Sequence, residues 1–465
     1  MKEIKTSIIP VFPDFFKIDN SKHEPDLKAI CIFAATGFFL EQDTYWRDEK
    51  VLSPGSINRL NDKGGLENSS SWFEWNYNPR ELSFKQALEE FTYLFEEIIK
   101  DQVKNSPVIL PLSGGLDSRS QALALLRNSN EVNSYSYSFT GGYPESKIAR
   151  EIAKVCGFPF KEFFIPNGYL WNDIQELAEI NKCYSEFTHP RQMAVLSEFK
   201  KMDGIFSLGH WGDVLFDRGA PPNLKEGDQV SYLLKSVVKK SGMDLADTLW
   251  KLWELEGTFE EYLRDRFSTL LSAFDISNTS AKIRAFKSQY WAPRWTSTNL
   301  SIFNEAQPIS LPYYDDRMCE FICTIPEKYL ADRAIQIAYI KQHDQLSRIT
   351  WEAHKPFNLH TYKKNRVPFN LPYRIYKKLQ RESSALMGEK FIQRNWELQF
   401  LGDENEQNLL SYLFDESFNQ FIPRSLVKNF YSRFLNENRV QYSHSVSTLL
   451  TLALWNQNYN DGPSR

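Results

Sequence analysis

The stretch "VILPLSGGLDSR" (108–119) joins an apolar run to a helix-like pattern through two glycines, an acid and two serines. Glycines let the backbone pass close to a ligand because they carry no Cβ. A helix that begins there directs unpaired N–H groups and its positive dipole end at the same place. Ser113 and Ser118 can donate hydrogen bonds to phosphate. Asp117 would repel a bare phosphate, so we expect Mg²⁺ between this acid and the phosphates.

The same stretch also has a simpler interpretation. Gly-Gly alone fits a tight strand-to-helix turn in which Ser113 or Asp117 caps the helix. No lysine follows the glycines, so the stretch is not the Walker-type loop that holds a γ-phosphate.

The full string resembles the pyrophosphate loop of the N-type ATP pyrophosphatases, and among them the synthetase domain of glutamine-hydrolysing asparagine synthetases. The family loop reads Ser-Gly-Gly-Leu-Asp-Ser-Ser, so six of seven positions match and Arg119 replaces the last serine. The resemblance implies cleavage of ATP between its α- and β-phosphates. We expect Arg119 to add a cation near those phosphates.

A second motif, "GHWGDVLF" (209–216), resembles the family sequence Gly-Glu-Gly-Ala-Asp-Glu-Leu-Phe. By this resemblance Asp213 is the second Mg²⁺-binding acid, across from Asp117. His210 stands where the family has a glutamate used in proton transfer. Its ordinary pKa of about 6.5 suits a base at neutral pH, although a packed histidine beside Trp211 is an equal alternative.

The resemblance implies further site residues. "YSYSF" (135–139) resembles the strand that passes the adenine, and "LPYYDDRM" (311–318) resembles a later family segment in which Asp315 matches an aspartate. For the lysine that stabilises the family's transition state, the nearest residue is Lys341, with Arg333 as an alternative. The implied nucleotide site comprises Leu112, Ser113, Gly114, Gly115, Asp117, Ser118, Arg119, Tyr137, Leu208 and Gly209.

The first part of the chain resembles the end of the family's glutaminase domain, at "TGFFLEQDTYWRDEKVLSPGS" (36–56). The family nucleophile is a cysteine directly after the initiator methionine, whereas position 2 here is Lys2. We therefore expect a truncated glutaminase-like domain without glutamine hydrolysis.

The pattern of elements predicts an α/β fold with a parallel sheet. Apolar strands alternate with helices of 10 to 15 residues between 108 and 208, after a helix predicted from Glu81 to Lys104. We expect three regions: a β-rich domain at 1–80 with strands at 29–40, the ATP pyrophosphatase core at 81–228, and a mainly helical part at 229–465. A helix is expected at 332–352, and Pro144 near the start of another.

The composition restricts the possible partners. With 55 basic and 59 acidic residues and a net charge of -4, the chain has no basic stripe for nucleic acid. Five cysteines without a CxxC pair favour a reducing compartment. No apolar run reaches the ~20 residues of a membrane helix and no signal-peptide cleavage site is visible. We expect a cytoplasmic protein with no membrane partner.

Several further residues lie outside these motifs. We expect Trp291 and Trp295 to be core residues and the basic run 362–366 to be a solvated loop. Arg191, beside His189, suits either an anionic substrate or a helix that begins at Pro190.

The sequence thus predicts an ATP-dependent, amide-forming ligase whose substrates are ATP with Mg²⁺ and a small-molecule or peptide carboxylate. The nitrogen would come from free ammonia, a separate glutaminase subunit or an amine of the substrate. Two alternatives remain: a nucleotide-binding scaffold that has lost catalysis, and tRNA modification on the same fold, which the acidic balance disfavours.

Overall fold

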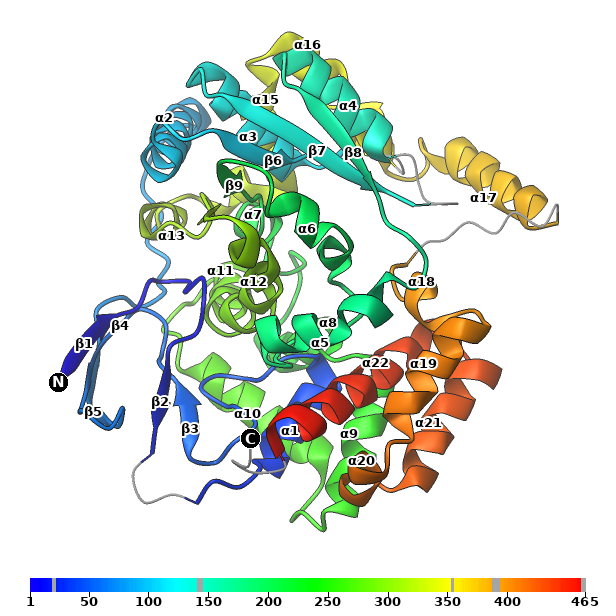
Figure 1. The fold of residues 1–465 in the computed structure, drawn as a ribbon. Coiled ribbons are helices and arrows are strands. Elements are labelled where there is room, and N and C mark those ends of the chain that lie inside the picture. Colours follow the sequence, from blue (N-terminus) through cyan, green and yellow to red (C-terminus); the bar gives the residue numbers. More distant parts are fainter. Residues whose placement is uncertain (19–21, 140–144, 353–354, 387–393, 461–465) are drawn as a thin grey trace.

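A five-stranded parallel sheet forms the centre of the α/β part in the computed structural model, which describes residues 1–465 except 19–21, 140–144, 353–354, 387–393 and 461–465 (Figure 1). In spatial order the strands are β10 (Ile309–Ser310), β9 (Ile205–Ser207), β6 (Val108–Pro111), β7 (Val132–Ser138) and β8 (Phe160–Phe164). The predicted fold class is confirmed.

The strand order reverses at β6, because the chain continues from β6 to β7 on one side and later places β9 on the other. Ligands of open α/β sheets bind at such a switch point, outside the carboxyl ends of the strands. The helices that accompany these strands are α2 (Phe84–Val103), α3 (Leu116–Arg127), α4 (Glu145–Cys156), α5 (Tyr169–Asn181), α6 (Leu196–Phe199) and α7 (Gly212–Leu215). The predicted helix at 81–104 is therefore confirmed as α2, whereas Pro144 lies outside the described residues.

The N-terminal region contains two small antiparallel sheets and a buried helix. The sheets are β1 (Lys2–Lys5), β4 (Ser56–Leu60) and β5 (Leu66–Ser71), and β2 (Phe15–Lys17) with β3 (Glu49–Val51). The prediction of strands at 29–40 is wrong, because α1 (Leu27–Thr36) occupies most of this stretch. A short apolar run is compatible with either a buried strand or a buried helix, because both bury all of their side chains. Every residue from Ala29 to Thr36 is buried in α1.

The rest of the chain is mainly helical. Its elements up to residue 358 are α8 (Gln229–Val237), α9 (Lys240–Leu252), α10 (Phe259–Ser272), α11 (Thr279–Phe286), the π-helix η3 (Lys287–Thr296), α12 (Ser297–Ala306), α13 (Asp316–Cys323), α14 (Glu327–Leu330), α15 (Ala334–Lys341), α16 (Asp344–Arg348), β11 (Thr350–Glu352) and β12 (Lys355–Asn358). They are followed by α17 (Leu371–Leu386), α18 (Glu397–Phe400), α19 (Asp403–Leu413), α20 (Glu416–Phe421), α21 (Arg424–Asn436) and α22 (Arg439–Trp455).

The prediction of one helix at 332–352 is wrong, because the chain forms two short helices, α15 and α16, separated at His343, whose backbone is extended. Neither helix reaches the predicted ends. Asp332 and Arg333 have φ angles of 59° and 61°, so the right-handed helix begins only at Ala334. At the other end the chain forms the antiparallel hairpin of β11 and β12.

One hydrophobic cluster includes residues from all three predicted regions, among them Ile32, Leu110 and Leu450. The boundaries at 80 and 228 therefore remain a prediction. Among the described helices, none combines the length and apolar character needed to cross a membrane.

Candidate active site

A cavity of about 610 Å³ opens where the strand order reverses, beyond the carboxyl ends of β6, β7 and β9. The residues after β6 and β9 line one part, and residues of η1 (Arg191–Val195) and η3 line another. The lining residues are Pro111, Leu112, Ser113, Gly115, Asp117, Ser118, Tyr135, Ser136, Tyr137, Arg191, Gly209, His210, Trp211, Asp213, Val214, Trp291, Trp295 and Thr296. Nine residues singled out from the sequence thus meet in one place: Leu112, Ser113, Gly115, Asp117, Ser118, Tyr137, Gly209, His210 and Asp213.

The loop after β6 is ordered by its own serines. The hydroxyl of Ser113 accepts a hydrogen bond from the N–H of Gly115 at 3.2 Å and lies 3.3 Å from the hydroxyl of Ser118. No side chain caps the N-terminus of α3, where Gly115 is the N-cap residue. The first turn of α3 therefore keeps amide donors for an anion in the cavity.

Asp117 lies tightly against the loop that carries Asp213. A Cβ on Gly212 would lie 2.2 Å from Oδ1 of Asp117, so only glycine fits there. Gln336 donates a hydrogen bond to Oδ1 at 2.9 Å, and Arg333 forms an ion pair with the same atom. Burial raises the pKa of Asp117 to about 6, while Arg333 opposes this shift and the charge of Asp213 adds to it.

The two acids suit Mg²⁺ only in combination with phosphate. Asp117 and Asp213 line the same cavity, and Oδ2 of Asp117 takes part in neither of the bonds from Arg333 and Gln336. Within the described part of the chain, no group of three or more His, Cys, Asp or Glu residues could hold a metal by itself. Magnesium commonly binds through one or two carboxylates plus substrate phosphates, so this donor set fits a nucleotide-bound Mg²⁺.

His210 lies half-buried in the cavity wall. Burial lowers its pKa to about 4, against the opposing charge of Asp213, so the imidazole is neutral at pH 7. Its Nδ1 is buried and has no hydrogen-bond partner in the structure. A pKa of about 4 makes the ring a weaker base at pH 7 than the ordinary value of about 6.5 that the sequence argument used, so the role of His210 as base remains a prediction.

Arg119 does not reach the cavity, and the expectation that it places a cation near the phosphates is wrong. Its fully buried guanidinium donates hydrogen bonds to five carbonyl oxygens, including those of Gly114 at 3.0 Å and Thr350 at 2.8 Å. Gly114 also contacts this segment, since a Cβ there would lie 2.8 Å from the carbonyl oxygen of Trp351. Arg119 and Gly114 therefore hold β11 against the back of the phosphate loop.

Three other predicted residues, Gly114, Lys341 and Leu208, also lie outside the cavity lining. The Nζ of Lys341 is 5.7 Å from the ring centroid of Tyr362. The cation beside Asp117 is instead Arg333, in a left-handed conformation that the bond from the Asp332 N–H to Asp217, at 2.9 Å, helps to hold. Leu208 is fully buried, and its backbone N–H pairs with Ser310 of the sheet.

The wall opposite the phosphate loop contains residues that the sequence assigned elsewhere. Trp291 and Trp295 line the cavity instead of lying entirely in the core, and Arg191 joins them. The guanidinium carbon of Arg191 lies 5.7 Å from the ring centroid of Tyr137. Trp291 packs edge-on against Trp211, whose Nε1 donates a hydrogen bond to Ser288 at 3.0 Å. No local motif indicates this wall, because π-helix geometry has no clear sequence signature.

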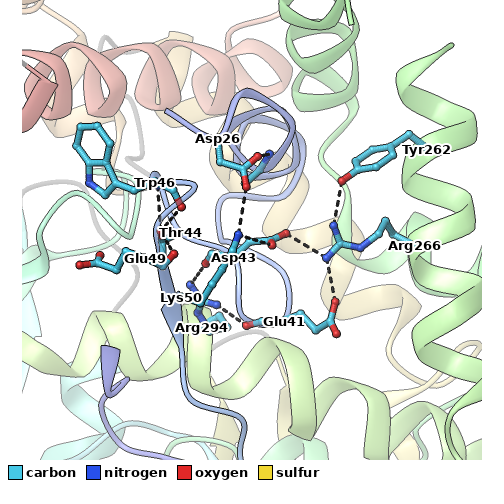
Figure 2. A network of polar contacts seen from close by, with 11 residues as sticks. Asp26, Glu41, Asp43, Thr44, Trp46, Glu49, Lys50, Tyr262, Arg266 and Arg294 are labelled. Atoms are coloured by element: carbon cyan, nitrogen blue, oxygen red, sulfur yellow. Dashed lines mark hydrogen bonds and ion pairs between the residues drawn. The ribbon is translucent and has the colours of Figure 1, made fainter. Parts of the chain in front are cut away.

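The N-terminal region holds η3 in place through a polar network (Figure 2). The buried guanidinium of Arg294 donates to the carbonyl oxygens of Glu41 and Asp43. The carboxylate of Asp43 also pairs with Arg266 at 3.0 Å and with Lys50 at 3.4 Å. The N-terminal region thus supports the wall that contains Trp291 and Trp295, the tryptophan wall of the cavity.

The C-terminal helices support the segment that carries Arg191. The buried carboxylate of Glu186 accepts hydrogen bonds from Ser447 of α22 at 2.5 Å and from the Thr188 N–H at 2.8 Å, and it pairs with His189 at 3.0 Å. Burial by itself would raise the pKa of Glu186, but the charge and hydrogen bond of His189 outweigh it and hold the pKa well below the usual range.

Part of the chain is similar to known proteins. Residues 90–219 match the family model of asparagine synthase. Two solved structures are similar at low identity: NMN synthetase from Francisella tularensis (15% identity, 44% of this chain and 93% of that chain, TM-score 0.23) and glutamine-dependent NAD⁺ synthetase from Acinetobacter baumannii in complex with ADP (14% identity, 54% of each chain, TM-score 0.21). No curated protein matches the chain.

Such TM-scores carry no argument about function, so the family match is the informative result. It begins inside α2 and ends just after α7. It includes Ser113, Asp117, His210 and Asp213 but neither η3 nor Arg333. The phosphate side of the cavity therefore lies within the part of the chain, residues 90–219, that matches the asparagine synthase family model.

Proposed function

We propose that this protein is an ATP-dependent ligase that adenylates a substrate carboxylate and passes the acyl group to a nitrogen nucleophile. The observation that carries the proposal is the convergence of the Ser113–Ser118 loop and Asp213 at one cavity. They come from two strands on either side of the switch point, within the segment that matches asparagine synthase.

In the first step a carboxylate oxygen of the substrate attacks the α-phosphorus of ATP, and the bond to the bridging oxygen of the β-phosphate breaks. Pyrophosphate leaves and carries the charge that must be stabilised. The loop amides and the hydroxyls of Ser113 and Ser118 supply fixed donors for that charge. Asp117 and Asp213 would hold Mg²⁺, which when bound neutralises part of the phosphate charge.

Arg333 is a cation paired with Asp117, although its side chain, like that of Lys341, is not among the residues that line the cavity. Its guanidinium already pairs with Asp117, and the left-handed backbone at Arg333 is a costly conformation of the type found at functional sites. We assign to Arg333 the role that the sequence assigned to Lys341, which is to balance negative charge beside the phosphates.

In the second step the nitrogen attacks the acyl carbon, AMP leaves, and the nitrogen loses a proton. His210 is the base that we propose for this proton, since it is neutral and lines the cavity. The nitrogen donor can be ammonia, a partner glutaminase or an amine of the substrate.

The tryptophan wall suggests where the carboxylate substrate binds. Arg191 makes no hydrogen bond or ion pair through its side chain to any described residue, so its guanidinium is available for a carboxylate. Trp291 and Trp295 provide flat apolar surface beside it. We propose that the acyl substrate carries an apolar or aromatic body next to its carboxylate.

Exchange of labelled pyrophosphate into ATP tests this function. The purified protein is incubated with ATP, Mg²⁺ and a panel of aliphatic and aromatic carboxylic acids. We expect carboxylate-dependent exchange that Asp117→Asn and Asp213→Asn each reduce by about a hundredfold or more. Asp247→Asn is the control, because Asp247 lies at an exposed position on α9 and does not line the cavity. ATP binding without exchange across the panel would favour the scaffold alternative.

A further inference from the structure

Helix α17 (Leu371–Leu386) lies apart from the other elements at the edge of the molecule (Figure 1). None of the described hydrophobic side chains between 366 and 386 belongs to the core cluster or packs against it. Helices in a folded chain normally bury their apolar face, so α17 and the residues before it form a surface without a partner inside this chain.

This surface gathers much of the exposed apolar area of the protein. Twelve large hydrophobic side chains are exposed among the described residues, and six of them fall between 367 and 379. These six are Val367, Phe369, Leu371, Ile375, Tyr376 and Leu379, each between 46% and 63% exposed. Scattered exposed hydrophobic residues are normal, whereas a gathered patch marks an interaction site.

The helix is also amphipathic with a basic polar face. Leu371, Ile375 and Leu379 recur every fourth residue and so share one face. Arg374 and Lys377 fall on the neighbouring face, with Lys378 beside them. A helix with Lys and Arg on one face and leucine, isoleucine and aromatic residues on the other suits the boundary between lipid headgroups and acyl chains.

The charge of the whole segment is unusual for this protein. Between 355 and 381 there is no Asp or Glu, in a chain that has more acids than bases. The same stretch contains eight basic residues: Lys355, Lys363, Lys364, Arg366, Arg374, Lys377, Lys378 and Arg381. Three of these side chains pair within the chain, Lys355 with Glu352, Arg366 with Asp332 and Lys378 with Glu382. The remaining basic residues favour a partner that is negatively charged as well as apolar.

We propose that α17, with the preceding residues 363–369, binds the surface of a membrane rich in anionic lipids. At 16 residues α17 is shorter than the ~20 residues of a spanning helix, so it would lie in the plane of the interface. The apolar face inserts between headgroups while the basic face contacts their phosphates. The expectation of no membrane partner considered only spanning segments and did not address this mode of binding.

The site described above is linked to this surface through the chain. Arg119 holds the carbonyls of Ile349 and Thr350, and the hairpin of β11 and β12 leads from there towards α17. The proposed membrane-binding surface therefore follows, along the chain, the segment that lies behind the phosphate loop.

Sedimentation with lipid vesicles tests the proposal on the full chain. Vesicles of phosphatidylcholine alone are compared with vesicles that also contain phosphatidylglycerol, at low and high salt. We expect binding to the anionic vesicles, weakened at least tenfold by high salt, and little binding to the neutral ones. Ile375→Asp with Leu379→Asp should weaken binding about a hundredfold, and Lys377→Gln with Lys378→Gln about thirtyfold.

The matched control is Tyr93→Asp with Val440→Asp, which changes two exposed hydrophobic residues outside α17 and should leave vesicle binding intact. Circular dichroism and thermal unfolding verify that each variant is folded. Equal binding by the Ile375/Leu379 variant and the control would overturn the proposal. So would binding of poly-glutamate without binding of anionic vesicles, which would assign the surface to an acidic protein instead. Pyrophosphate exchange is measured in a separate assay, so an absence of vesicle binding would not contradict the proposed ligase function.

Discussion

The two walls of the cavity are built in different ways. The phosphate wall comes from two short turns, at 112–118 and 209–213, each directly after a strand of the sheet. The opposite wall takes Arg191 from η1 and its tryptophans from η3, about a hundred positions apart. The first wall depends on local backbone geometry. The second wall depends on buried polar groups from distant parts of the chain. We therefore expect substitutions in the first wall to affect activity and substitutions that support the second wall to affect stability as well.

The largest expected effect is on the phosphate wall, from Gly212→Val. The new side chain would collide with the carboxylate of Asp117 and with the ring of Tyr313, and would displace the acid from the cavity. Because a misplaced charged group loses its electrostatic benefit, we expect pyrophosphate exchange to fall about a thousandfold. Gly227→Val is the control, since a Cβ at Gly227 meets nothing within 4 Å. Full activity of Gly212→Val would show that Asp117 is not needed where it lies.

The next largest effect should be a loss of stability caused by Arg294→Met. The change leaves the carbonyl oxygens of Glu41 and Asp43 without the donors seen in Figure 2. Two buried acceptors without partners should lower the free energy of unfolding by about 3 kcal/mol, measured by urea denaturation. The variant that still folds should bind the carboxylate poorly but ATP normally. Arg264→Met, at an exposed position on α10, controls for loss of an arginine.

Arg191→Gln should separate the two walls directly. Loss of a charge-assisted hydrogen bond to the substrate carboxylate should raise its KM about tenfold and leave the KM for ATP unchanged. Steady-state kinetics with each substrate varied in turn measures this split. A rise in the KM for ATP alone would show that Arg191 binds ATP and not the carboxylate, which would contradict the assignment of different substrates to the two walls.

The smallest expected effect concerns Glu186, which supports the segment of Arg191. Its pKa is lower in the folded protein than the usual ~4.3 of the unfolded chain. Its contribution to stability is therefore present above about pH 4.3 and is lost as the pH falls further. Glu186→Gln should cost about 1 kcal/mol at pH 7. In urea denaturation at pH 3.5, the difference in free energy of unfolding between the variant and the wild type should be smaller than at pH 7. An equal difference at the two pH values would contradict this.

The phosphate wall could be predicted because its residues are consecutive. The order strand, Ser-Gly-Gly and helix predicts a turn at a sheet edge, and the resemblance of 209–216 to a family motif predicts that Asp213 lies across from Asp117. The wrong predictions about the site concern side chains whose direction depends on contacts with distant parts of the chain. Arg119 stands beside the phosphate loop in sequence, yet buried carbonyls of 346–351 hold its guanidinium on the far side.

The sequence by itself determined the parallel α/β core and the helix at 84–103, because strand–turn–helix patterns act over a few residues. Its resemblance to a known family, and not such a local pattern, predicted that Asp117 and Asp213 lie at one cavity. Only the tertiary structure decided that 27–36 is a helix, that Arg333 and not Lys341 meets Asp117, and that two tryptophans line the cavity. Burial and long-range polar contacts select among local alternatives of similar energy, and no short stretch of sequence contains the partners that make that selection.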